Sequence, residues 1–541
     1  MSNQERQAAG SQAPSVRATG SPASSVFVRE ATGLVKNVSF FDSIALNMSN
    51  MSVGAMLGVI GISGLLPMLF SGVSMDGVNL VMLSIIAFVV SFPQIGIYTI
   101  MSRRMPRTGG DYVWVSRVFG GPVGSVLSFM GYTAETTAYL ALIVLSTVFA
   151  IGSVGLFFTY SDTLAGLAIP AGTAGSIPLY QLIVGGLVFA ALIGINVVRP
   201  KAGYRLVSIL TIYGFFALIL AIGALLYAGN SGVQSFMNTG YMNINGTSTY
   251  SVVSSQYPGG FFNFGNTIFL LPFLAAFTYP WLNAAPAVAS EIKGKSSIRW
   301  NVPISALLVF IFVTSSLATL YYVGGQAFTN AAYSNPTLVY NFSFNFWTLA
   351  MGVSNNSIIA GLIGLGWILA NLGVLAYGVI VISRYLLAQS FDRFLPSRIS
   401  YVSPRFASPV YAFLISLVVT VVLVGLAAFY YSGLSGLFGA IIASMIYFVF
   451  VGLAAAVWGI RKEKGSAKLI LAVAGILNVF VFGFLTYQFI AYPAVWSLNS
   501  LTVAFVVGTF VLGAVVYYAS KAYHARKGVD ISLAYKEIPP E

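Results

Sequence analysis

Long apolar runs make up most of the chain, and polar residues gather in short intervals between them. A helix needs about 20 apolar residues to cross the hydrocarbon core of a bilayer, and a dozen runs reach that length. The pattern therefore predicts an all-α polytopic membrane protein. The twelve expected transmembrane helices span residues 40–66, 77–101, 119–150, 178–198, 203–228, 262–289, 300–325, 357–389, 408–431, 435–460, 467–491 and 498–522.

The composition agrees with a protein that lies in a membrane. Of the 541 residues, 57% are hydrophobic and 7% are charged, and the mean hydropathy is +0.87. A soluble domain carries about 25% charged residues, so this chain has too little charge to cover its surface in water. The composition therefore argues against a soluble enzyme.

The positions of the basic residues predict the topology. If twelve helices alternate across the membrane, all 26 Lys and Arg residues fall on one side, in the two tails, in the loops after even-numbered helices, or within a few residues of the helix ends that border them. Lys and Arg are retained on the cytoplasmic side during insertion, so we expect a multi-pass protein of the cell membrane with both termini cytoplasmic. Topology and contact with anionic membrane lipids then explain the net charge of +13, and no nucleic-acid partner is expected.

The opposite face carries almost no charge. Residues 229–261 and 326–356 contain no charged residue, and Asp76 and Asp162 are the only ones expected outside. A surface without carboxylates has little to titrate near about pH 4, which suggests an acidic external medium. A transport optimum at neutral or alkaline external pH would count against this hypothesis.

Few residues are available for catalysis or metal binding. The chain has no cysteine, and its single histidine, His524, lies near the C-terminus. Disulfides, thiolate metal sites and cysteine nucleophiles are therefore excluded. No enzymatic activity, metal or cofactor is expected. A channel would need a continuous polar stripe, whereas the polar breaks occur at two points.

Helices one to five and six to ten form two blocks of equal helix number. Because five is odd, the second block enters from the opposite side, which predicts an inverted 5+5 repeat followed by helices eleven and twelve. In secondary transporters of this kind the first helix of each repeat is broken near mid-membrane, so helices one and six should be interrupted. The expected units are a disordered cytoplasmic tail at 1–38, the first repeat at 39–228, an extracellular loop at 229–261, the second repeat at 262–460, helices eleven and twelve at 461–523, and a cytoplasmic tail at 524–541.

Both of these helices contain residues that weaken helical structure. Residues 47–58 carry Asn and Ser, whose side chains compete for backbone hydrogen bonds, and glycines, each of which costs about 1 kcal/mol in a helix. Helix six contains Pro272, Pro280 and Pro286, and a proline in a helix interior costs about 3 kcal/mol. Glycine and proline are also common in intact membrane helices, so the argument depends on their matching places in the two repeats.

Two interrupted helices would form a pocket for an α-amino acid. The amide groups that begin the outer half of helix one suit a carboxylate, and freed carbonyl groups in helix six suit an ammonium group. The aromatic side chains of helix six would enclose the substrate or gate the site, and packing against lipid or core is the alternative for each. The predicted substrate-binding residues are Asn50, Met51, Ser52, Val53, Gly54, Phe277, Thr278, Tyr279 and Trp281.

Four segments on the predicted cytoplasmic side share a recognisable pattern. They are Pro106-Arg107-Thr108-Gly109-Gly110-Asp111-Tyr112, Ile195-Asn196-Val197-Val198-Arg199-Pro200-Lys201, Ser290-Glu291-Ile292-Lys293, and Ser383-Arg384-Tyr385 with Asp392-Arg393-Phe394-Leu395-Pro396. In this order the segments resemble the amino acid–polyamine–organocation superfamily of permeases. The resemblance covers most of helices one to ten and implies a membrane carrier of amino acids or related amines.

The chain departs from that family in two places. The family's glycine-rich signature in helix one is only partly present, as Ser52-Val53-Gly54-Ala55. Some members have a lysine in helix five that can replace a sodium ion, but the matching stretch, Ser208 to Gly214, contains no lysine. That coupling device therefore does not carry over to this chain.

Glu135 is the one acidic residue deep inside a predicted helix. A charge at that depth costs about 2.5–3.5 kcal/mol or more, so the carboxyl group favours its protonated form and could carry a proton. A structural hydrogen bond to a neighbouring helix is the alternative. A sodium site would need several oxygens, and Asn371 alone offers a side-chain oxygen in the middle of helix eight. We therefore favour proton coupling over sodium coupling, with uncoupled exchange close behind.

Together these features predict a permease that takes up an amino acid or related amine by alternating access, coupled to protons. The alternatives are an exchanger or polyamine carrier, and a sensor that binds amino acids without moving them. The side chain that is recognised and the oligomeric state are not predicted, because aromatic walls suit both apolar and cationic ligands.

Overall fold

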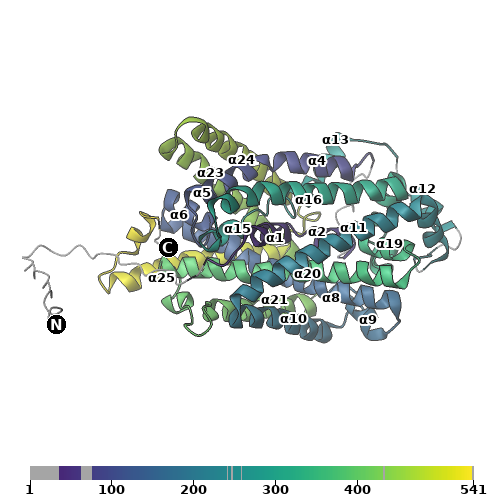
Figure 1. Cartoon of the computed structure of the whole chain (residues 1–541), viewed down its shortest axis with the longest axis horizontal. Helices are drawn as coiled ribbons and strands as arrows, with labels where there is room; N and C mark the ends of the chain where they lie inside the picture. The colour runs from purple at the N-terminus through teal and green to yellow at the C-terminus, as the bar shows by residue number, and fades with distance from the viewer. Residues whose placement is uncertain are drawn as a thin grey trace, which may run out of the picture.

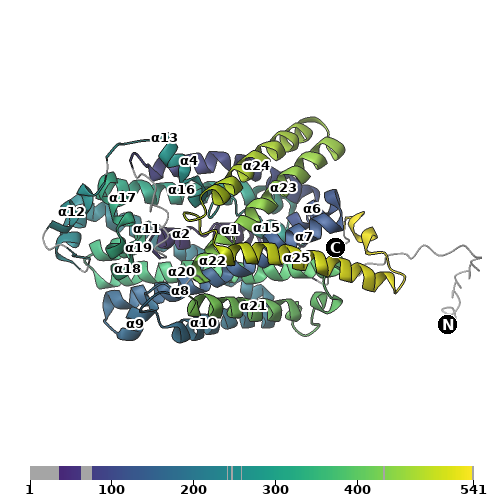
Figure 2. The same cartoon turned by 180° about the vertical axis from the view of Figure 1, so that it is seen from behind.

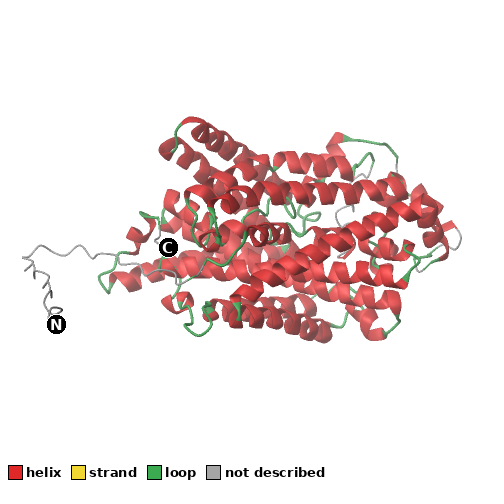
Figure 3. Cartoon of the chain, in the orientation of Figure 1, coloured by secondary structure: helices red, strands yellow, loops and turns green. Residues whose placement is uncertain are grey.

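The computed structural model describes residues 34, 36–62, 76–240, 242–244, 248–257, 259–430 and 433–538, with the backbone alone for 59–62 and 340–341. Most of the tail expected at 1–38, and residues 63–66 of the first expected helix, lie outside these ranges. The described chain is almost entirely helical (Figure 3), with three isolated β-bridges between loop segments.

Ten helices in the described part are long and apolar enough to cross a membrane. They are α4–α5 (Leu80–Val90, Phe92–Arg104), α7–η1–α8 (Gly121–Ser128, Phe129–Ala134, Glu135–Phe158), α10 (Pro178–Val198), α11 (Pro200–Thr239), α16 (Lys295–Gly324), α20 (Ser357–Phe391), α21 (Val410–Phe429), α22–α23 (Gly433–Gly439, Ile442–Lys462), α24 (Gly465–Ala491) and α25 (Ser500–Ala525). Each corresponds to one of the twelve spans expected from the apolar pattern.

The other two expected spans, 40–66 and 262–289, are divided into short helices. The first contains α1 (Phe40–Asn50) and α2 (Val53–Ile62), and the second contains α13 (Phe264–Phe269), α14 (Leu271–Ala275) and α15 (Ala284–Ala287). None of these five helices reaches the length of a membrane span, so the described chain has ten continuous spans where the apolar pattern predicts twelve.

The segments that connect the spans are also largely helical. They contain α6 (Asp111–Phe119), α9 (Asp162–Leu167), α12 (Thr249–Ser255), η3 (Ala289–Glu291), α17 (Gln326–Ser334), α18 (Pro336–Phe342), α19 (Phe346–Val353) and η4 (Ser397–Ser400), and η5 (Ile531–Tyr535) follows the last span. Helical structure thus extends into the stretches 229–261 and 326–356. Asn345 caps α19 through the backbone N–H groups of Trp347 and Thr348, which lets this short helix bury its apolar side chains.

The long helices lie roughly side by side along the longest axis of the molecule, and α1 and α2 lie near its centre (Figures 1 and 2). α1 contacts α11, α16 and α20, and α2 contacts α8, α19 and α20. α4 and α24 lie along one long edge in Figure 1, and α10 and α21 lie along the other. The interrupted first segment is therefore enclosed by continuous helices.

The outer helices turn apolar side chains outward. Phe480 on α24 is 70% exposed, and Val507 and Leu512 on α25 are exposed as well. A large exposed apolar surface would be unstable in water and is normal for helices that face lipid. The structure and the composition thus agree on a multi-pass membrane protein.

The chain before α1 pairs with the chain after α15. The backbone N–H of Val38 donates to the carbonyl of Glu291 at 3.0 Å, and that of Lys293 donates to the carbonyl of Val38 at 2.9 Å. Val38 and Ile292 also form an isolated parallel β-bridge. These contacts hold the segment before α1 against the segment after α15.

Candidate functional site

The first expected transmembrane helix is interrupted at Met51 and Ser52, between α1 and α2. Ser52 has a φ of 55°, a left-handed conformation that is uncommon for residues other than glycine. Its hydroxyl donates to the Asn50 carbonyl at 3.0 Å and accepts a hydrogen bond from Tyr139 Oη at 2.7 Å. These two bonds stabilise the turn at Ser52, where the helical hydrogen-bond pattern between α1 and α2 is interrupted.

The second interruption covers residues 276–283, between α14 and α15. Pro280 has no N–H group to continue a helix, and its carbonyl accepts a hydrogen bond from Gln94 Nε2 at 2.9 Å. The indole N–H of Trp281 donates to the Ala276 carbonyl at 2.8 Å. In this conformation the protein itself therefore occupies two carbonyl groups of the segment that was expected to bind a substrate ammonium.

Side-chain hydrogen bonds join the two interruptions. Asn50 Nδ2 donates to Asn283 Oδ1 at 2.9 Å, and the backbone N–H of Ala285 donates to Asn47 Oδ1 at 2.9 Å. Three buried polar atoms in this region have no partner among the residues that the structure describes: Asn47 Nδ2, Asn50 Oδ1 and Thr278 Oγ1. Buried polar atoms are nearly always hydrogen-bonded, so these three atoms mark a place where a polar ligand can bind.

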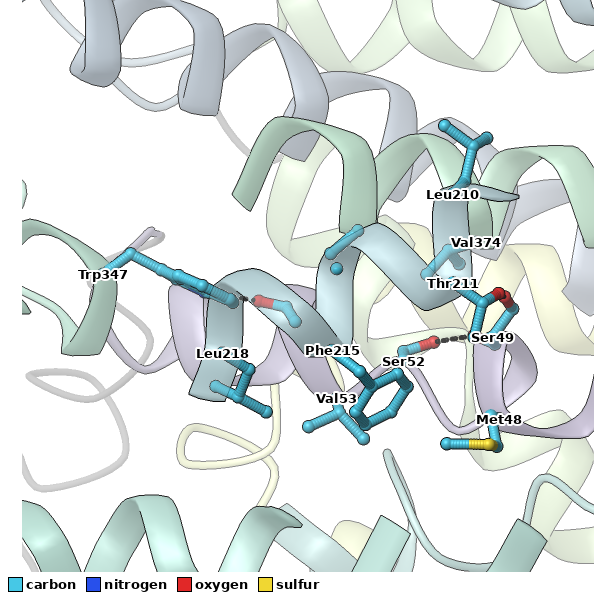
Figure 4. A pocket seen from close by; sticks show the side chains of 13 residues that line it. Met48, Ser49, Ser52, Val53, Leu210, Thr211, Phe215, Leu218, Trp347 and Val374 are labelled. Atoms are coloured by element: carbon cyan, nitrogen blue, oxygen red, sulfur yellow. Dashed lines mark hydrogen bonds between the residues drawn. The ribbon is translucent and has the colours of Figure 1, made fainter. Parts of the chain in front are cut away.

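A small cavity lies beside the first interruption and is lined from α1, α2, α11, α19 and α20 (Figure 4). Its volume is about 30 Å³, which is room for only a few water molecules. The Ser49 and Thr211 hydroxyls share a hydrogen bond of 2.6 Å, and the indole N–H of Trp347 donates to the Gly54 carbonyl at 2.9 Å. An amino acid needs more room than this, so the observed conformation is closed around the cavity.

The nine predicted substrate-binding residues fall into three groups. Ser52, Val53 and Gly54 line the cavity. Asn50 and Thr278 lie at or next to the interruptions and each keep an unpartnered polar atom. Met51, Phe277, Tyr279 and Trp281 are buried and do not line the cavity.

The three aromatic side chains pack against other helices. The ring of Phe277 stacks on a phenylalanine of α22 with 4.1 Å between centroids. Tyr279 Oη shares a hydrogen bond of 2.6 Å with Ser84 Oγ of α4. Trp281 stacks on Tyr139 of α8 with 5.8 Å between centroids and 9° between ring planes. These rings would have to move before they could enclose a substrate.

Glu135 lies where the π-helical segment η1 passes into α8. Its side chain is buried, and Oε2 has no hydrogen-bond partner in the described part of the chain. π-Helical turns within helices are frequent at functional sites. One helical turn later on α8, Tyr139 binds Ser52, so Glu135 lies one turn away from a residue that contacts the first interruption.

A second buried carboxylate, Asp111 at the start of α6, lies next to the second interruption. It accepts hydrogen bonds from three tyrosine hydroxyls, and Asn283 Nδ2 lies 3.5 Å away. The tyrosines are Tyr98 of α5, Tyr385 of α20 and Tyr447 of α23. Burial raises the pKa of Asp111 to about 6, although the hydrogen bonds act in the opposite direction. We call Asp111 and these three tyrosines the carboxylate cage.

Neither the carboxylate cage nor Asn283 was predicted as part of the site. The sequence offers only a chemical indication, namely that a carboxylate or an amide in an apolar environment needs hydrogen-bond partners. The partners of Asp111, however, are separated from it by between 13 and 336 residues. No local pattern identifies such partners.

Two buried ion pairs lie near the carboxylate cage, toward the end of the bundle that carries the described C-terminus. Arg384 donates to both oxygens of Glu291, at 2.9 and 3.0 Å. Arg117 donates to both oxygens of Asp392, at 2.5 and 2.8 Å. Removing one partner of a buried pair costs about 3–5 kcal/mol. These pairs therefore stabilise the contacts of α6, η3 and the C-terminal part of α20 in the observed conformation.

The same part of the chain is recognised by comparison with known proteins. A family model described as amino acid permease matches residues 38–512. This range includes both interruptions, Glu135 and the carboxylate cage. A direct comparison with curated proteins gives no match. Because the family model covers most of the chain, the protein belongs to the amino acid permeases of the amino acid–polyamine–organocation superfamily.

Proposed function

We propose that the protein is a secondary transporter that moves an amino acid or a related amine across the cell membrane by alternating access. The observation that carries this proposal is the contact between the two helix interruptions through Asn50 and Asn283. Beside this contact, Asn47 Nδ2 and Thr278 Oγ1 are buried without a partner. Discontinuous helices that present polar groups inside the bundle are the usual substrate site of secondary transporters.

In this proposal the two interrupted segments cross the membrane and complete twelve crossings with the ten continuous spans. The first ten crossings form an inverted 5+5 repeat, and each interrupted segment is the first of its repeat. Both termini lie in the cytoplasm, because the basic residues collect on their side of the membrane.

The substrate carboxylate would bind at the start of α2, where the backbone N–H groups of Val53 and Gly54 face the interruption and the helix end carries partial positive charge. The ammonium group would donate to Asn50 Oδ1 and Thr278 Oγ1, which have no partner in the closed conformation. Binding requires the cavity beside Gly54 to enlarge, and movement of Trp347 away from the Gly54 carbonyl is the simplest way to enlarge it.

We assign proton coupling to Glu135, because its buried Oε2 lacks a partner and its neighbour Tyr139 binds the first interruption. A sodium site is less favoured. The side-chain oxygen of Asn371 already accepts a hydrogen bond from Ser146 at 2.9 Å, so the main candidate ligand of helix eight is occupied.

Flux measurements test this proposal. The full-length protein is reconstituted in liposomes, and uptake of radiolabelled amino acids is followed with and without an inward proton gradient. Uptake that the gradient accelerates supports proton-coupled transport. Uptake that requires amino acid inside the vesicles identifies an exchanger, and binding without flux identifies a sensor. A thermal-shift screen against the twenty amino acids and common polyamines selects the substrate, since a ligand stabilises the state that it binds.

A further inference from the structure

A basic cavity lies between α5, α16 and α24, away from the two interruptions. Its volume is about 740 Å³, within the range of about 300–1,000 Å³ that is typical of ligand sites. Four cationic side chains line it: Arg103, Arg104, Lys295 and Arg299. Arg104 binds Glu463 at 2.7 Å, whereas the other three have no carboxylate within ion-pair distance in the part of the chain that the structure describes.

Two helices begin at the basic cavity. α16 starts at Lys295 and α24 starts at Gly465, and neither has a side-chain cap. The first N–H groups of each helix therefore have no partner within it, and each helix end carries partial positive charge. Ser296 and Ser466, which belong to these first turns, line the cavity.

The positions of the cations imply that an anion is needed. Cations are stabilising at the C-terminus of a helix and destabilising at its N-terminus. Arg103 and Arg104 follow this rule because they lie in the last turn of α5. Lys295 and Arg299 violate it because they lie in the first two turns of α16. Three uncompensated cations beside two positive helix ends suit a ligand with several negative oxygens, such as a phosphate group.

The apolar part of the cavity wall indicates that this phosphate belongs to a lipid. Ile100, Ile298 and Ile470 line the cavity beside the cations. Trp300 also lines it and is 45% exposed, and the Arg299 guanidinium lies 5.1 Å from its ring centroid. Tryptophan is enriched at membrane–water interfaces. From this point α24 continues as an apolar span whose surface exposes Leu477 and Phe480, along which acyl chains can lie.

We infer that the basic cavity binds the headgroup of an anionic phospholipid, in the leaflet that faces the cytoplasm in the proposed topology. The phosphate oxygens accept hydrogen bonds from Arg103, Lys295 and Arg299 and from the first N–H groups of α16 and α24. Basic pockets between membrane helices are suited to such headgroups. The site shares no residue with the substrate site, so the inference does not depend on transport.

The test uses the full-length protein in neutral detergent, titrated with phosphatidylglycerol, phosphatidylcholine and the soluble compound glycerol 3-phosphate. Native mass spectrometry counts bound lipid, and the thermal midpoint reports stabilisation. The variant is Lys295→Gln/Arg299→Gln. The matched control is Lys521→Gln/Arg526→Gln, which removes the same charge from exposed positions at the C-terminal end of α25 that do not line the cavity.

Phosphatidylglycerol should bind more tightly than phosphatidylcholine. Each basic side chain near an anionic headgroup contributes about a fivefold change in affinity, so the variant should bind phosphatidylglycerol about 25-fold more weakly. The control should bind like the unmodified protein. Equal affinity of the variant and the unmodified protein would overturn the inference, and so would an equal loss in the control. Glycerol 3-phosphate binding as tightly as phosphatidylglycerol would identify a soluble ligand instead.

The fold of the variant is checked in phosphatidylcholine alone. Because Lys295 and Arg299 lie at a positive helix end, their removal should leave the thermal midpoint unchanged or raise it. A lower midpoint would contradict the electrostatic argument on which the site depends.

Discussion

Asn50 and Asn283 form a hydrogen bond of 2.9 Å that joins two helix interruptions 233 residues apart in the sequence. Asn283 also lies 3.5 Å from Asp111, so its side chain stands between the first interruption and the carboxylate cage. A ligand that displaces Asn50 would therefore disturb the cage through one intervening residue. This relationship provides a physical route from the first interruption to the carboxylate cage.

Replacing Asn283 with alanine should reduce both stability and substrate affinity. The substitution leaves Asn50 with two unpartnered polar atoms, and an unsatisfied buried polar group costs about 1–3 kcal/mol. A loss of that size in the site corresponds to about a tenfold or greater fall in affinity. Thermal midpoints and binding titrations of the purified variant measure the two effects.

Asn478→Ala is the matched control for Asn283→Ala. Asn478 is equally buried, and its Nδ2 donates to the Phe448 carbonyl at 2.8 Å, a bond that includes no residue of either interruption. This control should lose stability and keep its substrate affinity. If both variants lose affinity to the same extent, Asn283 has no specific role in the site.

Gly54→Ala should displace α2 from α20 and prevent uptake. A Cβ at residue 54 would lie 2.3 Å from Ala370 Cβ, and overpacking of this kind costs about 1–3 kcal/mol. Adding Ala370→Gly removes the opposing methyl group and should restore uptake. A Cβ at residue 194 on α10 would meet no atom of another segment within 4 Å, so Gly194→Ala should raise the free energy of unfolding by up to about 1 kcal/mol. If Gly54→Ala combined with Ala370→Gly recovers no uptake, the contact with Ala370 is not the cause of the loss.

Asp111→Asn should remove the part of the folding stability that depends on protonation of Asp111. The pKa of Asp111 is raised to about 6 by burial, so the caged side chain binds a proton more tightly than it does in water. The cage is therefore most stable below about pH 4 and loses about 3 kcal/mol as the pH rises through 6. Thermal midpoints between pH 4 and 8 should fall with rising pH in the unmodified protein and change less in the variant.

The control for Asp111→Asn is Asp162→Asn, which changes an exposed aspartate near the start of α9. It should retain the pH dependence of the unmodified protein. An identical pH profile in Asp111→Asn and the unmodified protein would rule out the cage as the group that titrates in this range.

Glu135→Gln should abolish acceleration of uptake by a proton gradient while substrate binding persists. Glutamine keeps the size and polarity of the side chain but cannot exchange a proton, and the buried Oε2 has no partner that the substitution would break. Uptake with and without a gradient, together with a binding titration, separates coupling from affinity. Glu463→Gln, which changes a carboxylate bound to Arg104 near the ends of α5 and α23, should leave coupling intact. Gradient-driven uptake that survives in Glu135→Gln would move the coupling role to another residue.

The apolar pattern was sufficient to predict a helical membrane protein and the places of its ten continuous spans. Bilayer thickness sets the length of a span, and the lipid environment sets its apolar composition. Each span can therefore be predicted from its own segment of the sequence. The two divided segments were also expected from local chemistry. Pro280 removes a helix hydrogen bond, and Asn50 and Ser52 compete for backbone groups, regardless of what surrounds them.

The tertiary structure alone decided which polar groups meet. Asp111 depends on Tyr447, which lies 336 residues away, and the basic cavity forms because the ends of three helices from different parts of the chain come together. Hydrogen bonds are short and directional, so their partners depend on how distant helices pack, which periodicity and local propensity do not encode. For the same reason, the occupied carbonyls of residues 276–283 and the closed cavity beside Gly54 became visible only in the folded chain.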